Sequence, residues 1–236
     1  MGCFPGSSTH GCRGMRWVGV IDATGPGVAG FAKGQRVGVG WNGGYDGTCD
    51  ACRRGDFFAC QDGRVTGMSS DGGLGHPAVQ YATKMGFLTV AIDRGQDKQK
   101  FAKELGAAEF IDSSARDAAA ELTKLGGARV VLAIAPSASA MSGLIGGLAP
   151  RGKLLAVGVP NEPLSIPAAA IVPAARSVEG WYSGVSIDSE DTLAFSHRTG
   201  VRSMNEAFPL DRAPEAYARM LSGKMRYRGV LTMARR

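Results

Sequence analysis

The chain has 236 residues, enough for one or two domains that bury a core without disulfides. Hydrophobic residues make up 44% and charged residues 20%, a balance that excludes a disordered acidic or basic chain. The net charge is +6, and residues 212–236 carry seven Lys/Arg and one Glu. We interpret this tail as a solvated cationic surface, with nucleic acid and a small anionic ligand as alternatives.

The sequence contains no apolar run long enough for a membrane span and no basic–apolar leader pattern. We therefore expect a cytoplasmic protein with no membrane partner.

The first part of the chain is rich in glycine, with 20 of the 35 glycines in residues 1–80. Residues 1–15 have no periodicity and are treated as an irregular start. Two alternating Val-rich runs between Trp17 and Trp41 flank a Gly/Pro turn region, which predicts antiparallel strands with one buried face. Residues 42–63 are expected to form an irregular lobe.

After Gly75 the pattern changes to alternating helices and apolar strands. Strands that are almost wholly apolar, separated by helices of about 10 residues, indicate a parallel sheet covered on both faces. The predicted strands are FLTVAI, EFID, ARVVLAI, KLLAVGV and a last RGVLTM. The predicted helices cover residues 76–85, a segment with Phe101 and Leu105 that ends at Gly106, a segment up to Leu125, a segment up to about Leu148, and residues 186–199 and 211–222.

The segment GTCDACRRGDFFAC carries a metal-site pattern. Cys49-x2-Cys52 followed by Cys60 places three thiolates in a short loop, and Zn²⁺ takes such ligands in a tetrahedron. Two residues separate Asp46 from Cys49, which continues the spacing, so we predict Asp46 as the fourth ligand. Four protein ligands leave no open position, which makes this a structural zinc site. The alternative is a set of reduced cysteines without metal.

The segment DGGLGH, residues 71–76, precedes a predicted helix. Glycines at this position let backbone N–H groups and the helix N-terminus approach a pyrophosphate. Asp93 ends the next strand, 18 residues after Gly75, where a carboxylate binds an adenosine ribose. The alternative is a tight turn followed by a helix-capping Asp.

These motifs, in this order, resemble the zinc-dependent medium-chain alcohol dehydrogenases. The resemblance extends from Trp17 to Met233 through GQRVGVGW, GTCDACRRGDFFAC, GGLGHPAVQYATKMGF and PRGKLLAVGV. It implies an α/β fold, with part of a GroES-like β lobe in residues 16–70 and a Rossmann-type doubly wound parallel sheet in residues 71–205, followed by a C-terminal helix and strand in residues 206–236. It also implies hydride transfer between a small alcohol or aldehyde and NAD, with NADP as the alternative, and a homo-oligomer formed through the Rossmann sheet.

The resemblance assigns cofactor contacts position by position. Asp93 matches the ribose-binding carboxylate and favours NAD, because a 2′-phosphate would meet its charge, although Arg94 softens that exclusion. The other matches are the pyrophosphate turn, a lysine near the adenosine, the strand end at the nicotinamide and an arginine near the pyrophosphate: Gly72, Gly73, Leu74, Gly75, Lys98, Val157, Val159 and Arg228.

The chain departs from the family at the catalytic zinc. The family's Gly-His-Glu motif is replaced by Gly14-Met15-Arg16, so the imidazole ligand is lost. His10 lies nearby but out of register. The segment with a later cysteine ligand and the first Rossmann strand is also missing, since DGG runs directly into GLGH. We therefore expect no intact catalytic residues. The central strand position is predicted to be either empty or filled by RVTGMS, residues 64–69.

Three functions compete at this point. The first is an alcohol dehydrogenase with impaired turnover, and the second is a non-catalytic module that binds nucleotide or pairs with other subunits. The third is a zinc-knuckle nucleic-acid binder. We reject a nucleic-acid partner because we expect no exposed aromatic residues near the cysteines beyond Phe57 and Phe58.

Overall fold

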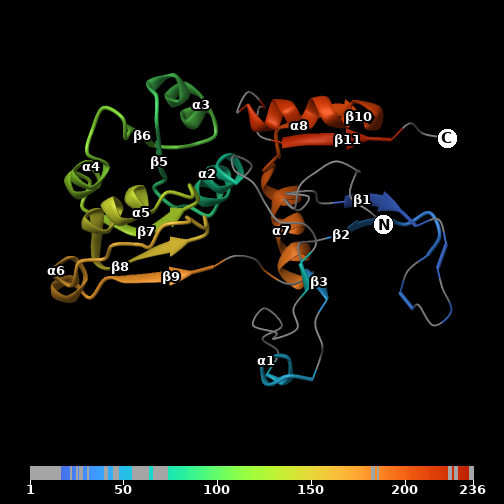
Figure 1. The fold of residues 1–236 in the computed structure, drawn as a ribbon, viewed down its shortest axis with the longest axis horizontal. Helices are drawn as coiled ribbons and strands as arrows, with labels where there is room; N and C mark the ends of the chain where they lie inside the picture. Colours follow the sequence, from blue (N-terminus) through green and yellow to red (C-terminus); the bar gives the residue numbers. More distant parts are fainter. Residues whose placement is uncertain are drawn as a thin grey trace. The chain divides into compact units, whose positions relative to one another are not determined.

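The computed structural model describes residues 17–21, 23–24, 26, 29–30, 32–39, 42–44, 48–54, 64–65, 74–181, 184, 186–222, 225 and 228–233. The chain, whose helices and strands are labelled in Figure 1, divides into two compact units. The first contains residues 1–70 and 183–195, and the second contains residues 71–182 and 196–236. The division falls within α7 (Ser186–Thr199), a helix that the sequence predicts with the same bounds.

The first unit contains two short antiparallel pairs. β1 (Trp17–Val20) pairs with β2 (Arg36–Val39), which confirms the strands predicted from the alternating Val runs. β3 (Asn42–Gly44) pairs with β4 (Arg64–Val65). Along the chain, the short helix α1 (Asp50–Arg53) comes between β3 and β4.

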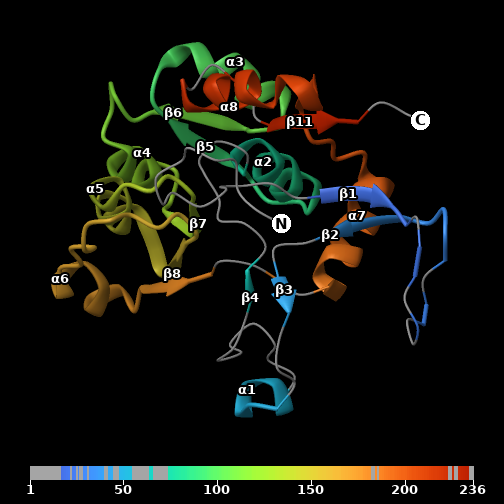
Figure 2. The same ribbon diagram turned by 45° about the vertical axis from the view of Figure 1, so that its right-hand side comes forward.

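Parallel strands form the framework of the second unit, as the apolar runs predict (Figure 2). Each strand follows a helix or turn, and neighbouring strands run in the same direction because each connection crosses over the sheet. One sheet pairs β5 (Val90–Asp93) with β6 (Glu109–Asp112), and a second pairs β7 (Ala128–Ala133), β8 (Leu148–Ala156) and β9 (Ser177–Gly180).

Helices pack against both faces of these strands, because alternate side chains point to opposite faces. Phe110 packs with residues of α2 and α3, while the neighbouring Ile111 packs with residues of α4 and α5. Leu154 of β8 lies at the centre of the second cluster and is 1% exposed. The helices on these faces are α2 (Gly75–Lys84), α3 (Gln99–Glu104), α4 (Ala118–Lys124) and α5 (Ala138–Leu144), and α6 (Ala168–Ile171) follows β8.

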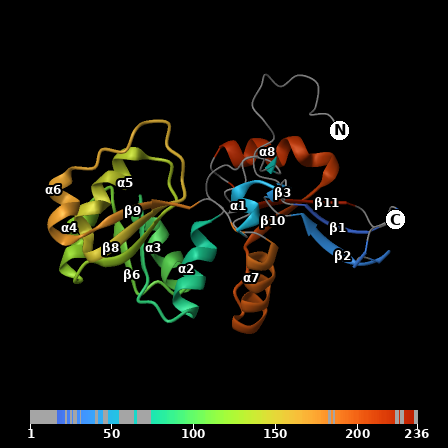
Figure 3. The ribbon, with the colours of Figure 1, turned by 90° about the horizontal axis from the view of Figure 1, so that it is seen from below.

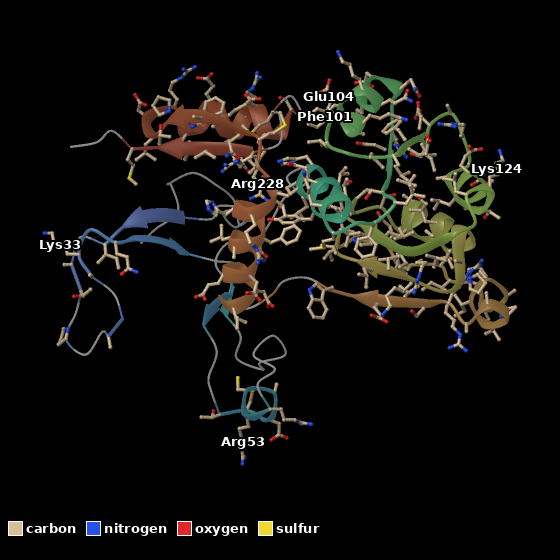
Figure 4. All side chains as sticks on the ribbon, turned by 180° about the vertical axis from the view of Figure 1, so that it is seen from behind. Lys33, Arg53, Phe101, Glu104, Lys124 and Arg228 are labelled. Atoms are coloured by element: carbon tan, nitrogen blue, oxygen red, sulfur yellow. The ribbon has the colours of Figure 1, made fainter. Side chains whose placement is uncertain are left out.

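Two of these helices end where the sequence predicts a stop. Gly106 after α3 has φ +106° and Gly126 after α4 has φ +97°, a conformation that glycine adopts without strain. Lys124, in the last turn of α4 (Figure 4), forms an ion pair of 2.6 Å with Glu121.

Within the described residues, no hydrogen bonds join β5 to β7, so the parallel strands form two sheets rather than one. Both sheets nevertheless share one core, since Val90 and Ile92 of β5 pack against the cluster that contains Val131 of β7. Arg64 and Val65 pair with β3 in the first unit, so this part of RVTGMS does not fill the central position. Residues 66–69 of that segment lie outside the described residues.

The chain ends in a further parallel pair, with α8 (Ala213–Leu221) packed along it (Figure 3). β10 (Asn205–Pro209) pairs with β11 (Arg228–Thr232). Two arginines of the basic tail form ion pairs of 2.6 Å, Arg212 with Glu215 and Arg219 with Glu206. Part of the tail's positive charge is therefore balanced within the fold. In the part of the chain that the structure describes, no helix is long and apolar enough to cross a membrane.

Candidate nucleotide and metal sites

Two aspartates lie at the carboxyl ends of parallel strands in the second unit. Asp93 ends β5 and Asp112 ends β6, directly opposite each other in the strand register. The loops after β7 and β8 leave the sheet at the same end, because β7 and β8 are parallel and Ala133 lies opposite Ala156. Ligands of open α/β sheets bind at this edge.

Asp93 and Lys98, predicted together as ribose and adenosine contacts, lie in contact. The Lys98 ammonium donates to Asp93 Oδ1 at 2.7 Å, and the Arg94 backbone N–H donates to the same oxygen at 2.7 Å. The Asp93 side chain remains 53% exposed and that of Lys98 47% exposed. An anchored, accessible carboxylate of this kind can accept hydrogen bonds from the two hydroxyls of a ribose.

The loop after β8 packs tightly against the loop after β7. The backbone N–H groups of Val157 and Gly158 both donate to the Ala133 carbonyl, at 2.9 and 3.0 Å. A Cβ on Gly158 would lie 2.3 Å from the carbonyl oxygen of Ile134, so only glycine fits here. Val159 follows this contact and is 80% exposed at the edge.

The N-terminus of α2 begins at the predicted pyrophosphate turn. Leu74 is the N-cap and Gly75 the first residue of this ten-residue helix. Among the described residues, no side chain caps the helix, and no atom lies within 4 Å of a Cβ built on Gly75. The backbone N–H groups at the start of a helix, together with its dipole, favour an anion. Gly72 and Gly73 lie outside the described residues.

His76, the second residue of α2, is buried and was not singled out by sequence reasoning. Its Nε2 accepts a hydrogen bond of 3.1 Å from the Met204 backbone N–H, and the side chain is 4% exposed. Burial, together with the positive charge of Arg228, lowers the pKa of His76 from 6.5 to about 4. Arg228 (Figure 4), predicted near the pyrophosphate, therefore lies close enough to act on the first turn of α2.

The lowered pKa of His76 predicts a pH-dependent stability. Between about pH 6.5 and pH 4 the unfolded chain binds a proton that the folded chain excludes, so acid favours unfolding. We expect the free energy of unfolding to fall by about 1–2 kcal/mol between about pH 7.5 and pH 5, after allowance for solvent screening of Arg228. Urea unfolding at the two pH values measures this change.

The variant His76→Gln is expected to remove this part of the pH dependence. The matched control is His197→Gln, since His197 is exposed on α7 and its replacement should leave the wild-type slope. An unchanged slope in His76→Gln would assign the effect to other groups.

Two of the four predicted zinc ligands lie in the described part of the first unit. Cys49 is the N-cap of α1, and its carbonyl accepts from the Arg53 backbone N–H at 2.9 Å. Cys52, three residues later, is 5% exposed. Residues three apart on a helical turn lie on one face, so this Cys-x2-Cys pair can supply two of the four predicted ligands. Asp46 and Cys60 lie outside the described residues, as do His10 and Met15.

Because only half of this predicted site is described, the residues that the structure describes contain no group of three or more His, Cys, Asp or Glu that could hold a metal ion. Cys49 and Cys52 are thiols, a ligand type that Zn²⁺ takes, and the four-ligand site stays a prediction.

Comparison with known proteins gives a consistent result. Residues 73–198 match the family model described as zinc-binding dehydrogenase, and residues 3–86 match the alcohol dehydrogenase GroES-like domain. The alcohol dehydrogenase patD of Penicillium expansum is 33% identical over 276 aligned positions, which cover 93% of this chain and 81% of that protein. The alcohol dehydrogenase notN of Aspergillus sp. (strain MF297-2) is 34% identical with the same coverage.

Solved structures agree on the fold. The alcohol dehydrogenase of the archaeon Aeropyrum pernix superposes with a TM-score of 0.80 at 22% identity, covering 91% of this chain and 80% of that one. A cinnamyl alcohol dehydrogenase from Sorghum bicolor superposes with a TM-score of 0.79 at 25% identity, covering 91% of this chain and 79% of that one.

The comparisons also show a difference in length. Since 93% of 236 residues is about 219, about 57 of the 276 positions aligned with patD have no counterpart in this chain. The two family models overlap over residues 73–86. This overlap coincides with the junction at which DGG runs into GLGH.

Proposed function

Because the chain belongs to the zinc-dependent medium-chain alcohol dehydrogenase family, we propose that it is an alcohol dehydrogenase-type oxidoreductase that binds NAD and oxidises alcohols with impaired turnover. The observation that carries the nucleotide assignment is the anchored Asp93 carboxylate, held by Lys98 at 2.7 Å at the carboxyl end of β5. Membership of this family implies a small alcohol, or the corresponding aldehyde, as the substrate.

The residues at the sheet edge fit NAD in three places. Backbone N–H groups at the start of α2 and Arg228 would hold the pyrophosphate, together with the predicted turn residues Gly72 and Gly73. Asp93 would accept from the adenosine ribose, and Val157 and Val159 would border the nicotinamide. When bound, NAD supplies the acceptor for a hydride from the alcohol carbon, and the alcohol hydroxyl also loses its proton, which gives an aldehyde or ketone and NADH.

We assign one structural zinc to the first unit. Its ligands would be Cys49 and Cys52 of the α1 turn, together with Asp46 and Cys60. Three thiolates and a carboxylate complete a tetrahedron, so this ion would hold the lobe together without contacting substrate.

Turnover is expected to be impaired because of residues that the chain lacks. Met15 and Arg16 stand where the family has the His and Glu of its catalytic zinc site, and a thioether and a guanidinium do not replace a neutral imidazole on Zn²⁺. The missing internal segment removes a further ligand and part of the substrate pocket. Without the catalytic zinc, an alcohol keeps its high pKa and gives up its proton slowly.

The test combines binding and turnover on the purified chain. We expect NAD to bind in a calorimetric titration, while oxidation of short aliphatic and benzylic alcohols stays at least a hundredfold below the ~10 s⁻¹ of a typical enzyme. Turnover at the typical rate would contradict the impairment. Absence of binding by both NAD and NADP would contradict the nucleotide site.

A second candidate function is a non-catalytic subunit-pairing module. It is favoured by the separation of the strands into two parallel sheets, since an unpaired strand edge in the described residues is a template for another chain. Sedimentation of the chain alone tests this function. A monomer at all concentrations would exclude pairing with itself.

The ribose assignment of Asp93 predicts a change in cofactor preference. In Asp93→Ser the two hydroxyls of the NAD ribose lose a charged acceptor, so we expect NAD affinity to fall about tenfold to a hundredfold. Because the negative charge is removed, NADP affinity should rise at the same time. Titration with both nucleotides measures the ratio.

The control for this variant is Asp97→Ser, an exposed carboxylate on the same turn. We expect its NAD-to-NADP ratio to match the wild type. An unchanged ratio in Asp93→Ser would remove the ribose assignment.

A further inference from the structure

The buried carboxylate of Asp112 lies next to the proposed ribose site. Asp112 is the last residue of β6, opposite Asp93 in the register, and is 6% exposed. Its Oδ1 accepts three hydrogen bonds: from the Gly95 backbone N–H at 3.0 Å, the Ser114 backbone N–H at 2.9 Å and the Ser114 hydroxyl at 2.5 Å. These donors lower the pKa of Asp112, so the group accepts as a carboxylate.

The bond to Gly95 connects Asp112 to the turn that presents Asp93. Gly95 has φ +91°, and a Cβ at that position would lie 2.5 Å from Asp97 Oδ1. A turn that depends on this conformation needs outside contacts to stay fixed, because glycine itself has wide conformational freedom. In the structure, Asp112 supplies such a contact.

A second contact from the same loop holds the other side of the turn. The Ser113 backbone N–H donates to the Asp93 carbonyl at 2.9 Å, and the Ser113 hydroxyl donates to it at 3.3 Å. The loop after β6 therefore fixes the backbone on both sides of Arg94, through the Asp93 carbonyl and the Gly95 amide. The Asp93 side chain itself stays accessible and, among the described residues, accepts hydrogen bonds from the Arg94 N–H and Lys98.

We propose that Asp112 is a positioning residue for nucleotide selection. Through the Gly95 amide it fixes the turn so that the Asp93 carboxylate faces the ribose hydroxyls and opposes a 2′-phosphate. Asp112 does not itself contact the nucleotide. This inference rests on the proposed function, since it requires Asp93 to be the ribose contact.

The test compares Asp112→Ala with Asp112→Asn. Alanine removes the acceptor, so the turn loosens and we expect NAD affinity to fall by about fivefold to twentyfold, with a smaller NAD-to-NADP ratio. Asparagine keeps an acceptor oxygen at Oδ1, so it should restore most of the affinity and the ratio. All titrations are made well below the melting temperature of each variant, so that only folded protein is compared.

A purely structural role gives a different result. Asp117→Ala is the matched control, because the Asp117 carboxylate also accepts two backbone N–H bonds, from Ala119 at 2.9 Å and Ala120 at 3.3 Å, but none from residues 93–95. We expect it to lower stability by about 1 kcal/mol and to leave the nucleotide ratio unchanged. If Asp112→Ala behaves in the same way, the positioning role is wrong.

Amide hydrogen exchange separates this inference from the proposed function, because it needs no nucleotide. We expect the Gly95 N–H to exchange faster in Asp112→Ala and at the wild-type rate in Asp117→Ala. Faster exchange with no nucleotide binding by the wild-type chain would overturn the proposed function, and the inference with it. Unchanged exchange at Gly95 would overturn the inference alone.

Discussion

Replacing Cys52 by serine is expected to reduce the zinc content of the purified protein from about one ion per chain to nearly none. Cys52 is buried on α1, three residues after Cys49, and a serine hydroxyl stays protonated and binds Zn²⁺ poorly. Metal analysis of the monodisperse fraction measures the ratio of zinc to protein.

Loss of this zinc should also unfold the lobe around α1. A helix of four residues and pairs of two strands are marginal on their own, and these are the regular elements that the structure describes in residues 17–65. Structural zinc supplies folding free energy directly, so amide protection around residues 49–54 should disappear in Cys52→Ser and on treatment with a chelator.

Cys12→Ser is the control for this experiment, since Cys12 is not among the predicted ligands. Its zinc content should equal that of the wild type. A zinc-free wild-type chain would contradict the metal site, and two zinc ions per chain would contradict the conclusion that the catalytic zinc is lost.

The fold was predictable where the sequence is apolar and its breaks are marked by glycine. EFID is β6, and Gly126 ends α4 as expected. β9 (SVEG) and β10 (NEAFP) were not predicted, because each has few apolar residues and no alternation. β9 forms by pairing with β8, and β10 by pairing with β11. Such pairing depends on tertiary structure and cannot be predicted from the local sequence pattern.

The candidate site was predictable only where a spacing carries the chemistry. The interval from the glycine turn to Asp93 predicts a ribose-binding carboxylate there, and in the structure Lys98 donates a hydrogen bond to this side chain. Asp112 and His76 were missed because a single Asp after an apolar strand and a single His after a glycine turn look like surface residues. Their burial depends on the turn at Gly95 and on the loop at Met204, which come from distant parts of the sequence.

Gly158→Ala is expected to affect both stability and nucleotide binding. The added Cβ would lie 2.3 Å from the Ile134 carbonyl oxygen and 2.9 Å from the Ala135 carbonyl carbon, so backbone rather than a flexible side chain must move. Overpacking of this kind costs about 1–3 kcal/mol or more. For a unit of this size the melting temperature should fall by roughly 3–10 °C, which calorimetry measures.

The same movement would displace Val157 and Val159, which we place beside the nicotinamide. NAD affinity should therefore fall by about tenfold or more. The control is Gly180→Ala, at the end of β9, which should change neither the free energy of unfolding nor that of NAD binding by more than ~0.5 kcal/mol. In the described part of the chain, a Cβ at Gly180 meets no atom within 4 Å. If Gly158→Ala lowers the melting temperature but binds NAD like the wild type, then the loop after β8 supports the sheet without contacting the nucleotide. Asp93 and the start of α2 would then remain as the proposed cofactor contacts.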